Sequence, residues 1–279
     1  MHPLLPEFLF AVSIVAGFIG AVSGMGGGVV LIPVLTLIGV DIKHAIAISM
    51  VSVIATSSGA ASAYVREHIT NLKVGMFLEM FTILGAIVGA AVTLASGDRL
   101  LFIAFGIVLL LSWGTLFLRP HEAQGYLHKQ DRFSRWLELQ GSYFDHAQGE
   151  TIEYRARHAY LGGPMMFGAG FIAGLLGIGA GALKVLTLDL VMGLPAKVST
   201  TTSNLIIGVT ALAGTSVYLA AGLINPGIVA PVVLGVVAGA FLGTRVLKWM
   251  TNQTVRRLFL VVLLLLGVEM LLRGFGLFA

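Results

Sequence analysis

Long apolar stretches, separated by short polar connections, dominate this chain. Residues 44–65, 74–95, 100–118, 199–221, 227–247 and 258–277 each approach or exceed the roughly 20 apolar residues that a helix needs to cross a bilayer. Two longer stretches, 8–39 and 161–194, are interrupted by clusters of glycine. The pattern predicts an all-α polytopic membrane protein in which two of the helices are broken.

The two broken stretches are copies of each other. Gly24-Met25-Gly26-Gly27-Gly28 and Gly177-Ile178-Gly179-Ala180-Gly181 lie 153 residues apart, and the likeness continues as far as the helices that begin near 101 and 258. Between the copies, residues 119–158 are polar and charged. We therefore expect two transmembrane repeats, 1–118 and 159–279, joined by a connecting loop over 119–158 with a short amphipathic helix around 132–140.

Composition narrows the class of protein further. A mean hydropathy of +0.95 with only 11% charged residues does not describe a soluble domain, in which about 25% are charged. The net charge of +4 sits in loops beside apolar spans, which is typical of membrane topology and not of nucleic-acid binding. There is no cysteine, no nucleotide-binding motif, and no nucleophile spaced from a base as in an enzyme. We expect no metal, no cofactor and no catalysis.

The basic residues indicate how the broken stretches lie in the membrane. If both stretches re-enter and return to their own side, one face receives thirteen basic residues: Arg66, Lys73, Arg119, Lys129, Arg132, Arg135, Arg155, Arg157, Lys197, Arg245, Lys248, Arg256 and Arg257. The other face receives three, Lys43, Arg99 and Arg273. If both stretches span the membrane, the division is nine against seven. The positive-inside rule favours the first arrangement.

Each repeat is thus predicted to be one re-entrant helix hairpin followed by three transmembrane helices. An odd number of crossings makes the two repeats inverted, with their hairpins entering from opposite faces. The connecting loop is then cytoplasmic and both termini lie outside.

The glycine breaks are the first candidates for a binding site. Non-helical backbone at membrane depth is tolerated where it is buried in protein or lines a wet cavity. Each returning arm begins with free N–H groups and a positive dipole end, so two such ends could bind an anion near the midplane. Helix packing through small residues is the alternative, and we favour it for Gly85/Gly89, Gly170/Gly174 and Gly235/Gly239/Gly243. The candidate site glycines are Gly24, Gly26, Gly27, Gly28, Gly177, Gly179 and Gly181.

Polar residues near the breaks extend the candidate site. Lys184, three residues after the second break, would be a counter-charge for an anion; the alternative is snorkelling or a pair with Asp189. The helices that follow the hairpins carry hydroxyl and amide groups, which either line the substrate path or bond neighbouring helices. These candidates are Ser49, Ser52, Thr200, Thr201, Thr202, Ser203 and Asn204.

Two acidic residues fall within predicted spans. Glu79 has no acidic counterpart in the second repeat and is a candidate for proton coupling. Glu269 lies four residues before Arg273, a spacing that predicts an ion pair on one helix face.

The glycine motifs resemble those of a known family. Gly17-Phe18-Ile19-Gly20-Ala21-Val22-Ser23-Gly24-Met25-Gly26-Gly27-Gly28, followed by Pro33, and its copy over 170–181 are similar to the duplicated motif of the TauE/SafE sulfite exporter family. Residues 193–203, 235–243 and 256–259 also resemble it. This chain departs from the family pattern at Ala180, Lys184 and Asp189, and in the length of its central loop.

The resemblance implies a multi-pass protein of a prokaryotic cell membrane that carries a small sulfur-containing anion, such as sulfite, thiosulfate or an organosulfonate. It favours export by a secondary transporter, which would work by alternating access with binding at the two breaks. A passive anion channel is the alternative. A third hypothesis is a membrane-embedded receptor or assembly partner that acts through the 119–158 loop.

Overall fold

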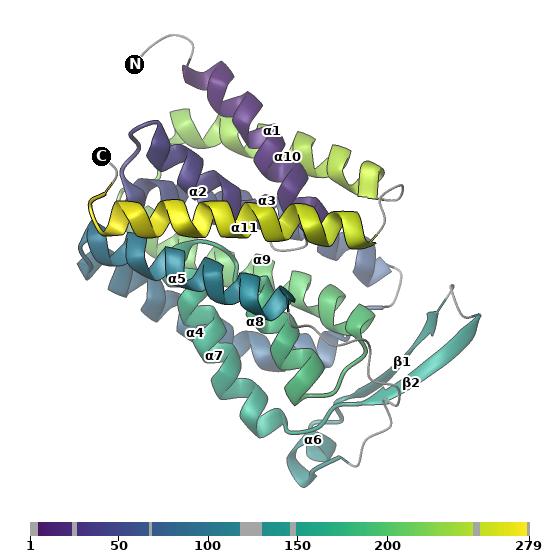
Figure 1. Cartoon of the computed structure of the whole chain (residues 1–279). Helices are drawn as coiled ribbons and strands as arrows, with labels where there is room; N and C mark the ends of the chain where they lie inside the picture. The colour runs from purple at the N-terminus through teal and green to yellow at the C-terminus, as the bar shows by residue number, and fades with distance from the viewer. Residues whose placement is uncertain are drawn as a thin grey trace.

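The computed structural model describes residues 5–23, 27–66, 69–117, 130–145, 149–247 and 252–277, which form a helical bundle with one small β-hairpin (Figure 1). The first half contains α1 (Leu5–Ser23), α2 (Gly28–Leu37), α3 (Ile42–Arg66), α4 (Leu72–Ala95) and α5 (Asp98–Phe117). The second half contains α7 (Ala159–Leu176), α8 (Gly181–Leu186), the π-helical turn η1 (Thr187–Val191), α9 (Ala196–Ala220), α10 (Pro226–Leu247) and α11 (Asn252–Gly274). Both halves follow the same order: a long helix, a short arm and three long helices.

Several described helices are suited to a bilayer. Five are long and apolar enough to cross one: α3 over Ile42–Gly59, α4, α7, α9, and α10 over Pro226–Gly243. Their outward surfaces carry large apolar side chains, among them Met76, Met80 and Leu84 on α4. Exposed apolar bands of this length belong in contact with lipid. The prediction of a polytopic helical membrane protein is confirmed.

The first helix of each half packs against the other half. α1 lies along α10, and α7, its counterpart in the second half, lies along α4. α3 packs on α9, and α5 packs on α11. A Cβ at Gly85 or Gly89 would collide with the backbone of α7, and one at Gly235 or Gly239 with that of α1. These glycines serve close helix packing, as their spacing predicted.

The ends of the two short arms lie at opposite ends of the bundle. Arg273, near the end of α11, donates from Nη1 to the Thr36 carbonyl near the end of α2, at 3.1 Å. The start of α1 and the end of α11 lie at this same end, and the β-hairpin projects from the other (Figure 1). There, the amide of Arg157 donates to the Met192 carbonyl at 3.0 Å, which joins the entry to α7 with the exit from η1.

The connecting segment is more structured than the sequence suggested. The helix expected around 132–140 ends early, as α6 (Arg132–Trp136), and residues 118–129 lie outside the described part. It is followed by an antiparallel hairpin of β1 (Gln140–Asp145) and β2 (Glu150–Arg155), which adds strands to a fold predicted as all-α. The hairpin forms because Tyr143 and Tyr154 bury themselves in an apolar cluster with α4, α7 and α9. Local periodicity does not reveal such a long-range contact.

Candidate functional site

The two glycine breaks meet at the centre of the bundle. Gly28 begins α2, and a Cβ placed on it would lie 2.6 Å from the carbonyl oxygen of Gly177 and would overlap the hydroxyl of Ser49. Ser49, on α3, donates that hydroxyl to the Gly177 carbonyl at 2.8 Å. Only glycine at position 28 permits this approach. The structure therefore brings together Gly28, Ser49 and Gly177, three of the residues singled out by sequence.

The second break is a sharp turn built from left-handed backbone. Gly177, Gly179 and Ala180 have φ angles of +68°, +70° and +48°, and α8 starts at the next residue, Gly181. Glycine adopts these angles without strain, whereas alanine at 180 does so at some cost. In the first break, Gly24 and Gly26 lie outside the described residues, and Gly27 precedes α2 with an ordinary φ of −68°.

A small cavity lies beside the contact between the breaks. Its wall combines Val29 at the start of α2 with the second break and with residues of α5 and α11; the remaining lining residues are Val108, Leu109, Ser112, Ile178, Ala180, Gly181, Ala182, Leu183 and Leu263. The side chains of this wall are almost all apolar. Polar contacts with a small ligand here would therefore come mainly from backbone groups of the two breaks.

Lys184, the residue after Leu183 of the cavity wall, is fully buried. Its side chain is 0% exposed, and its Nζ donates to the hydroxyl of Thr210 on α9 at 3.0 Å. Glu79 on α4, half-buried, interacts with it electrostatically. A buried cation in a membrane protein requires such partners. The structure thus places the predicted counter-charge and the predicted coupling acid, which come from different repeats, within electrostatic range of each other. No ion pair joins these two described residues, and Oε1 of Glu79 is buried without a hydrogen-bond partner among the described residues.

The Ser/Thr run of α9 divides into different environments. Thr201 and Asn204 bond carbonyls of their own helix, at Val198 and Thr200, both at 3.1 Å. Thr200 is exposed. In the first repeat, Ser52 likewise bonds the Ser49 carbonyl. These contacts are of the kind expected from the packing interpretation of hydroxyl residues.

Ser203 differs from its neighbours. It is 1% exposed, and its hydroxyl has no hydrogen-bond partner among the residues that the structure describes. Its repeat counterpart is Ser49, which bonds the opposite break. Buried hydroxyls are normally satisfied, so this group is an exception within the run.

Asn71 was missed by sequence reasoning. It caps α4 by accepting from the Val74 amide, donates from Nδ2 to the Tyr154 hydroxyl at 3.0 Å, and donates its own amide to Thr202 on α9 at 3.1 Å. The hairpin is thereby tied to the predicted lining helix. Its cap role was detectable, because asparagine directly before an apolar helical run is a common N-cap. Its contacts with Tyr154 and Thr202 were not.

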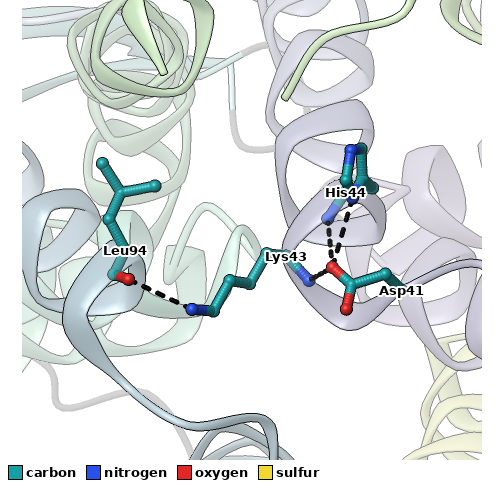
Figure 2. A network of polar contacts seen from close by, with 4 residues as sticks. All are labelled: Asp41, Lys43, His44 and Leu94. Carbon is teal, nitrogen blue, oxygen red and sulfur yellow. Dashed lines mark hydrogen bonds and ion pairs between the residues drawn. The ribbon is translucent and has the colours of Figure 1, made fainter. Parts of the chain in front are cut away.

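The three cations predicted to lie on the sparsely charged face have structural partners. Lys43 donates from Nζ to the Leu94 carbonyl at 3.1 Å, beside the cap in which Asp41 accepts the amides of Lys43 and His44 (Figure 2). Arg99 and Arg273 bond the Gly274 and Thr36 carbonyls. Each cation thus lies at a helix C-terminus, where the dipole favours positive charge. The predicted Glu269–Arg273 pair is confirmed, at 2.6 Å.

Comparison with known proteins agrees with this architecture. The family model described as sulfite exporter TauE/SafE matches residues 9–270. The chain is 27% identical over 274 residues to "Probable membrane transporter protein YunE" of Bacillus subtilis (strain 168), covering 95% of this chain and 97% of that protein. It is 26% identical over 242 residues to "Probable membrane transporter protein YdhB" of the same organism, covering 85% and 86%.

A shorter match is 31% identical over 97 residues to "Probable membrane transporter protein ORF9" of Sinorhizobium sp, covering 34% of this chain and 37% of that protein. No solved structure shows a significant match. The family match extends from within α1 to within α11 and includes both glycine breaks. The chain therefore belongs to the TauE/SafE sulfite exporter family of integral membrane proteins.

Proposed function

We propose that this protein is a secondary transporter that exports a small sulfur-containing anion, such as sulfite, thiosulfate or an organosulfonate. The observation that carries the proposal is the meeting of the two breaks, where Gly28, Ser49 and Gly177 converge from both repeats. Paired broken helices near the middle of a membrane are a typical arrangement for a transporter's substrate site.

The chemistry of the surroundings suits an anion. α2 begins at Gly28 without a side-chain cap at Gly27, so its positive dipole end lies at the contact between the breaks. The buried cation Lys184 directly follows Leu183 of the cavity wall. Hydroxyl donors such as that of Ser203 bind oxyanions without fixing their protonation state. Glu79 competes with the substrate for Lys184, so a proton on Glu79 would free the lysine to hold the anion. This exchange gives a simple route to proton coupling.

In the proposed topology, the two broken stretches are re-entrant hairpins that open toward opposite faces. The bond between Arg157 and Met192 supports this for the second hairpin, because it joins the entry and exit of that stretch. The bond between Arg273 and Thr36 supports it for the first, because it holds the end of α2 at the end of the bundle where α1 starts. The positive-inside rule then makes the 119–158 segment cytoplasmic.

Alternating access in this arrangement would be a movement between two tightly packed units. α1 with α10 and α4 with α7 are each joined through glycine contacts, so we take each pair to move as one body. The interfaces between α3 and α9 and between α5 and α11 would then slide. The site at the breaks lies between these units and would open to each side in turn.

Flux into proteoliposomes tests the function. We expect saturable uptake of sulfite or thiosulfate, with accumulation against a concentration gradient that follows an imposed pH difference. Competition by sulfate and by taurine, which differ from these anions in size and charge, measures the selectivity. Downhill, non-saturating flux would refute secondary transport and indicate a passive anion channel. Absence of flux for every sulfur anion would refute the substrate class.

Reporter tags test the topology separately. A tag in the 119–158 segment and one at the C-terminus should report opposite sides of the membrane. Finding both tags on one side would refute the inverted arrangement, whatever the flux measurements give.

A further inference from the structure

The short helix α6 has two chemically different sides. Its inner residue, Ser134, is fully buried, whereas Arg132, Phe133, Arg135 and Trp136 are all exposed, Trp136 to 76%. Five residues thus present two guanidinium groups and two aromatic rings to their surroundings. Large exposed aromatic side chains are uncommon on a water-facing surface and are enriched where protein meets the bilayer surface.

A carboxylate clamp fixes the orientation of α6. Asp131 caps the helix by accepting from the Ser134 amide at 3.1 Å, and also accepts the His158 amide at 2.7 Å. The Ser134 hydroxyl in turn accepts the first amide of α7, from Ala159, at 3.1 Å. Burial acts to raise the pKa of Asp131, but the hydrogen bonds that it accepts from the Ser134 hydroxyl and from the Ser134 and His158 amides outweigh burial, so the pKa lies below its usual value. The clamp is therefore ionised at neutral pH and holds α6 against the start of α7.

An aromatic ladder links α6 to the lipid-facing surface. Trp136 stacks on Phe133 with ring centroids 6.2 Å apart, Phe133 meets Phe77 of α4 edge-on at 5.9 Å, and Phe77 meets Phe81 at 5.5 Å. Met76 and Met80, beside these rings on α4, are each 67% exposed. The exposed side of α6 thus continues directly into an apolar band of a membrane-spanning helix.

We propose that α6 is a membrane-surface anchor, lying in the headgroup layer with Trp136 at the interface and with Arg132 and Arg135 bound to the phosphates of anionic lipids. The charge, the aromatic content and the continuity with α4 all point to this one occupant. Tryptophan favours the interface because its ring is apolar and its N–H is polar. Arginine binds phosphate oxygens with paired donors, and an anionic surface attracts each such charge.

The anchor would hold the connecting segment at a fixed position relative to the bilayer surface. α6 leads directly into β1, and the hairpin is bonded through Tyr154 to Asn71 at the start of α4. The hairpin itself projects away from the bundle (Figure 1). Phe144 on β1, which is 50% exposed, is therefore expected to lie in water while α6 lies in the headgroups, and this difference supplies a control.

Fluorescence quenching tests the anchor. In a variant whose only tryptophan is Trp136 (Trp113→Phe, Trp249→Phe), reconstituted in phosphatidylcholine and phosphatidylglycerol vesicles, lipids brominated near the headgroup should quench the emission strongly. The matched control moves the probe to the hairpin by Trp136→Phe and Phe144→Trp, and its emission should stay unquenched. Equal, weak quenching at both positions would overturn the proposal and leave α6 as a surface for a soluble partner.

A second pair of variants tests the arginines. Brominated phosphatidylglycerol should quench Trp136 more than brominated phosphatidylcholine does, and Arg132→Gln with Arg135→Gln should remove this preference, with roughly fivefold weaker anionic-lipid binding for each arginine lost. Arg155→Gln removes one exposed charge from the hairpin and should leave the preference unchanged. Arg132→Lys with Arg135→Lys keeps both positive charges and should retain most of the preference for phosphatidylglycerol. A preference that survives the glutamine pair would refute the headgroup site.

Discussion

The two returning arms have the same place in their repeats but differ in backbone and chemistry. α2 is a ten-residue α-helix with Pro33 inside it, apolar apart from Thr36 and mostly buried. The second arm starts with six α-helical residues, continues as the π-helical turn η1, and contains Lys184 and Asp189. Before it, the chain passes through the left-handed residues Gly177, Gly179 and Ala180.

Leu31 and Lys184, at equivalent positions in the two arms, show what this difference means. Both are 0% exposed, but Leu31 packs in the apolar core and Lys184 bonds Thr210 and interacts with Glu79. The duplicated frame therefore places two arms alike, and only the second brings a charge to the centre. π-Helical turns are also frequent at functional sites. We infer that the first arm serves as scaffold and that the second decides which anion binds.

The largest expected effect comes from closing the contact between the breaks. Gly28→Val would place a branched side chain against Ser49 and the Gly177 carbonyl, and should destabilise the folded protein by about 3 kcal/mol and abolish flux. Gly168→Ala, in α7, is the control, because a Cβ there meets nothing within 4 Å. Thermal unfolding in detergent measures the first effect and proteoliposome flux the second. A stable, active Gly28→Val protein would show that the breaks need not touch.

The charge of the second arm is tested next. Lys184→Met should weaken anion binding by about tenfold or more, equivalent to about 1.4 kcal/mol, because the counter-charge is lost. Leu31→Met changes the equivalent residue of the first arm and should leave affinity unchanged at a stability cost below about 1.5 kcal/mol. Isothermal titration with sulfite or thiosulfate measures both. If the two variants bind alike, the contrast between the arms does not extend to the substrate.

The paired serines give a smaller effect of a different kind. Ser49→Ala removes a buried hydrogen bond to Gly177 and should lower the free energy of unfolding by about 1 kcal/mol. Ser203→Ala removes a hydroxyl that has no partner among the described residues, so it should change stability little and weaken anion binding instead. The opposite result, a stability loss at Ser203 with normal affinity, would place Ser203 in the scaffold.

The smallest effect is expected where the arms end. Arg273→Gln removes the side-chain bond to Thr36 and the pair with Glu269, and should cost roughly 0.5–1 kcal/mol. The second arm is held at Met192 by the backbone amide of Arg157, so Arg157→Gln should leave the unfolding temperature nearly unchanged. Equal losses in the two variants would mean that the Arg157 side chain also holds its arm.

The sequence by itself determined the membrane class, the duplication and the glycines that pack helices. These features are local, because apolar length and residue spacing along one helix suffice to define them. It also indicated the Glu269–Arg273 pair, whose partners lie one helical turn apart.

Only the tertiary structure decided which candidates meet. Ser49 and Gly177 are 128 residues apart, Lys184 reaches Thr210 on another helix, and Asn71 joins the hairpin to α9. Such contacts depend on the path of the whole chain and on the packing of α1 and α7 each against the opposite half. The hairpin itself escaped prediction for the same reason, because it is stabilised by tyrosines buried against distant helices. The hydropathy of the sequence indicates which segments lie in the membrane, whereas tertiary packing determines which residues contact each other there.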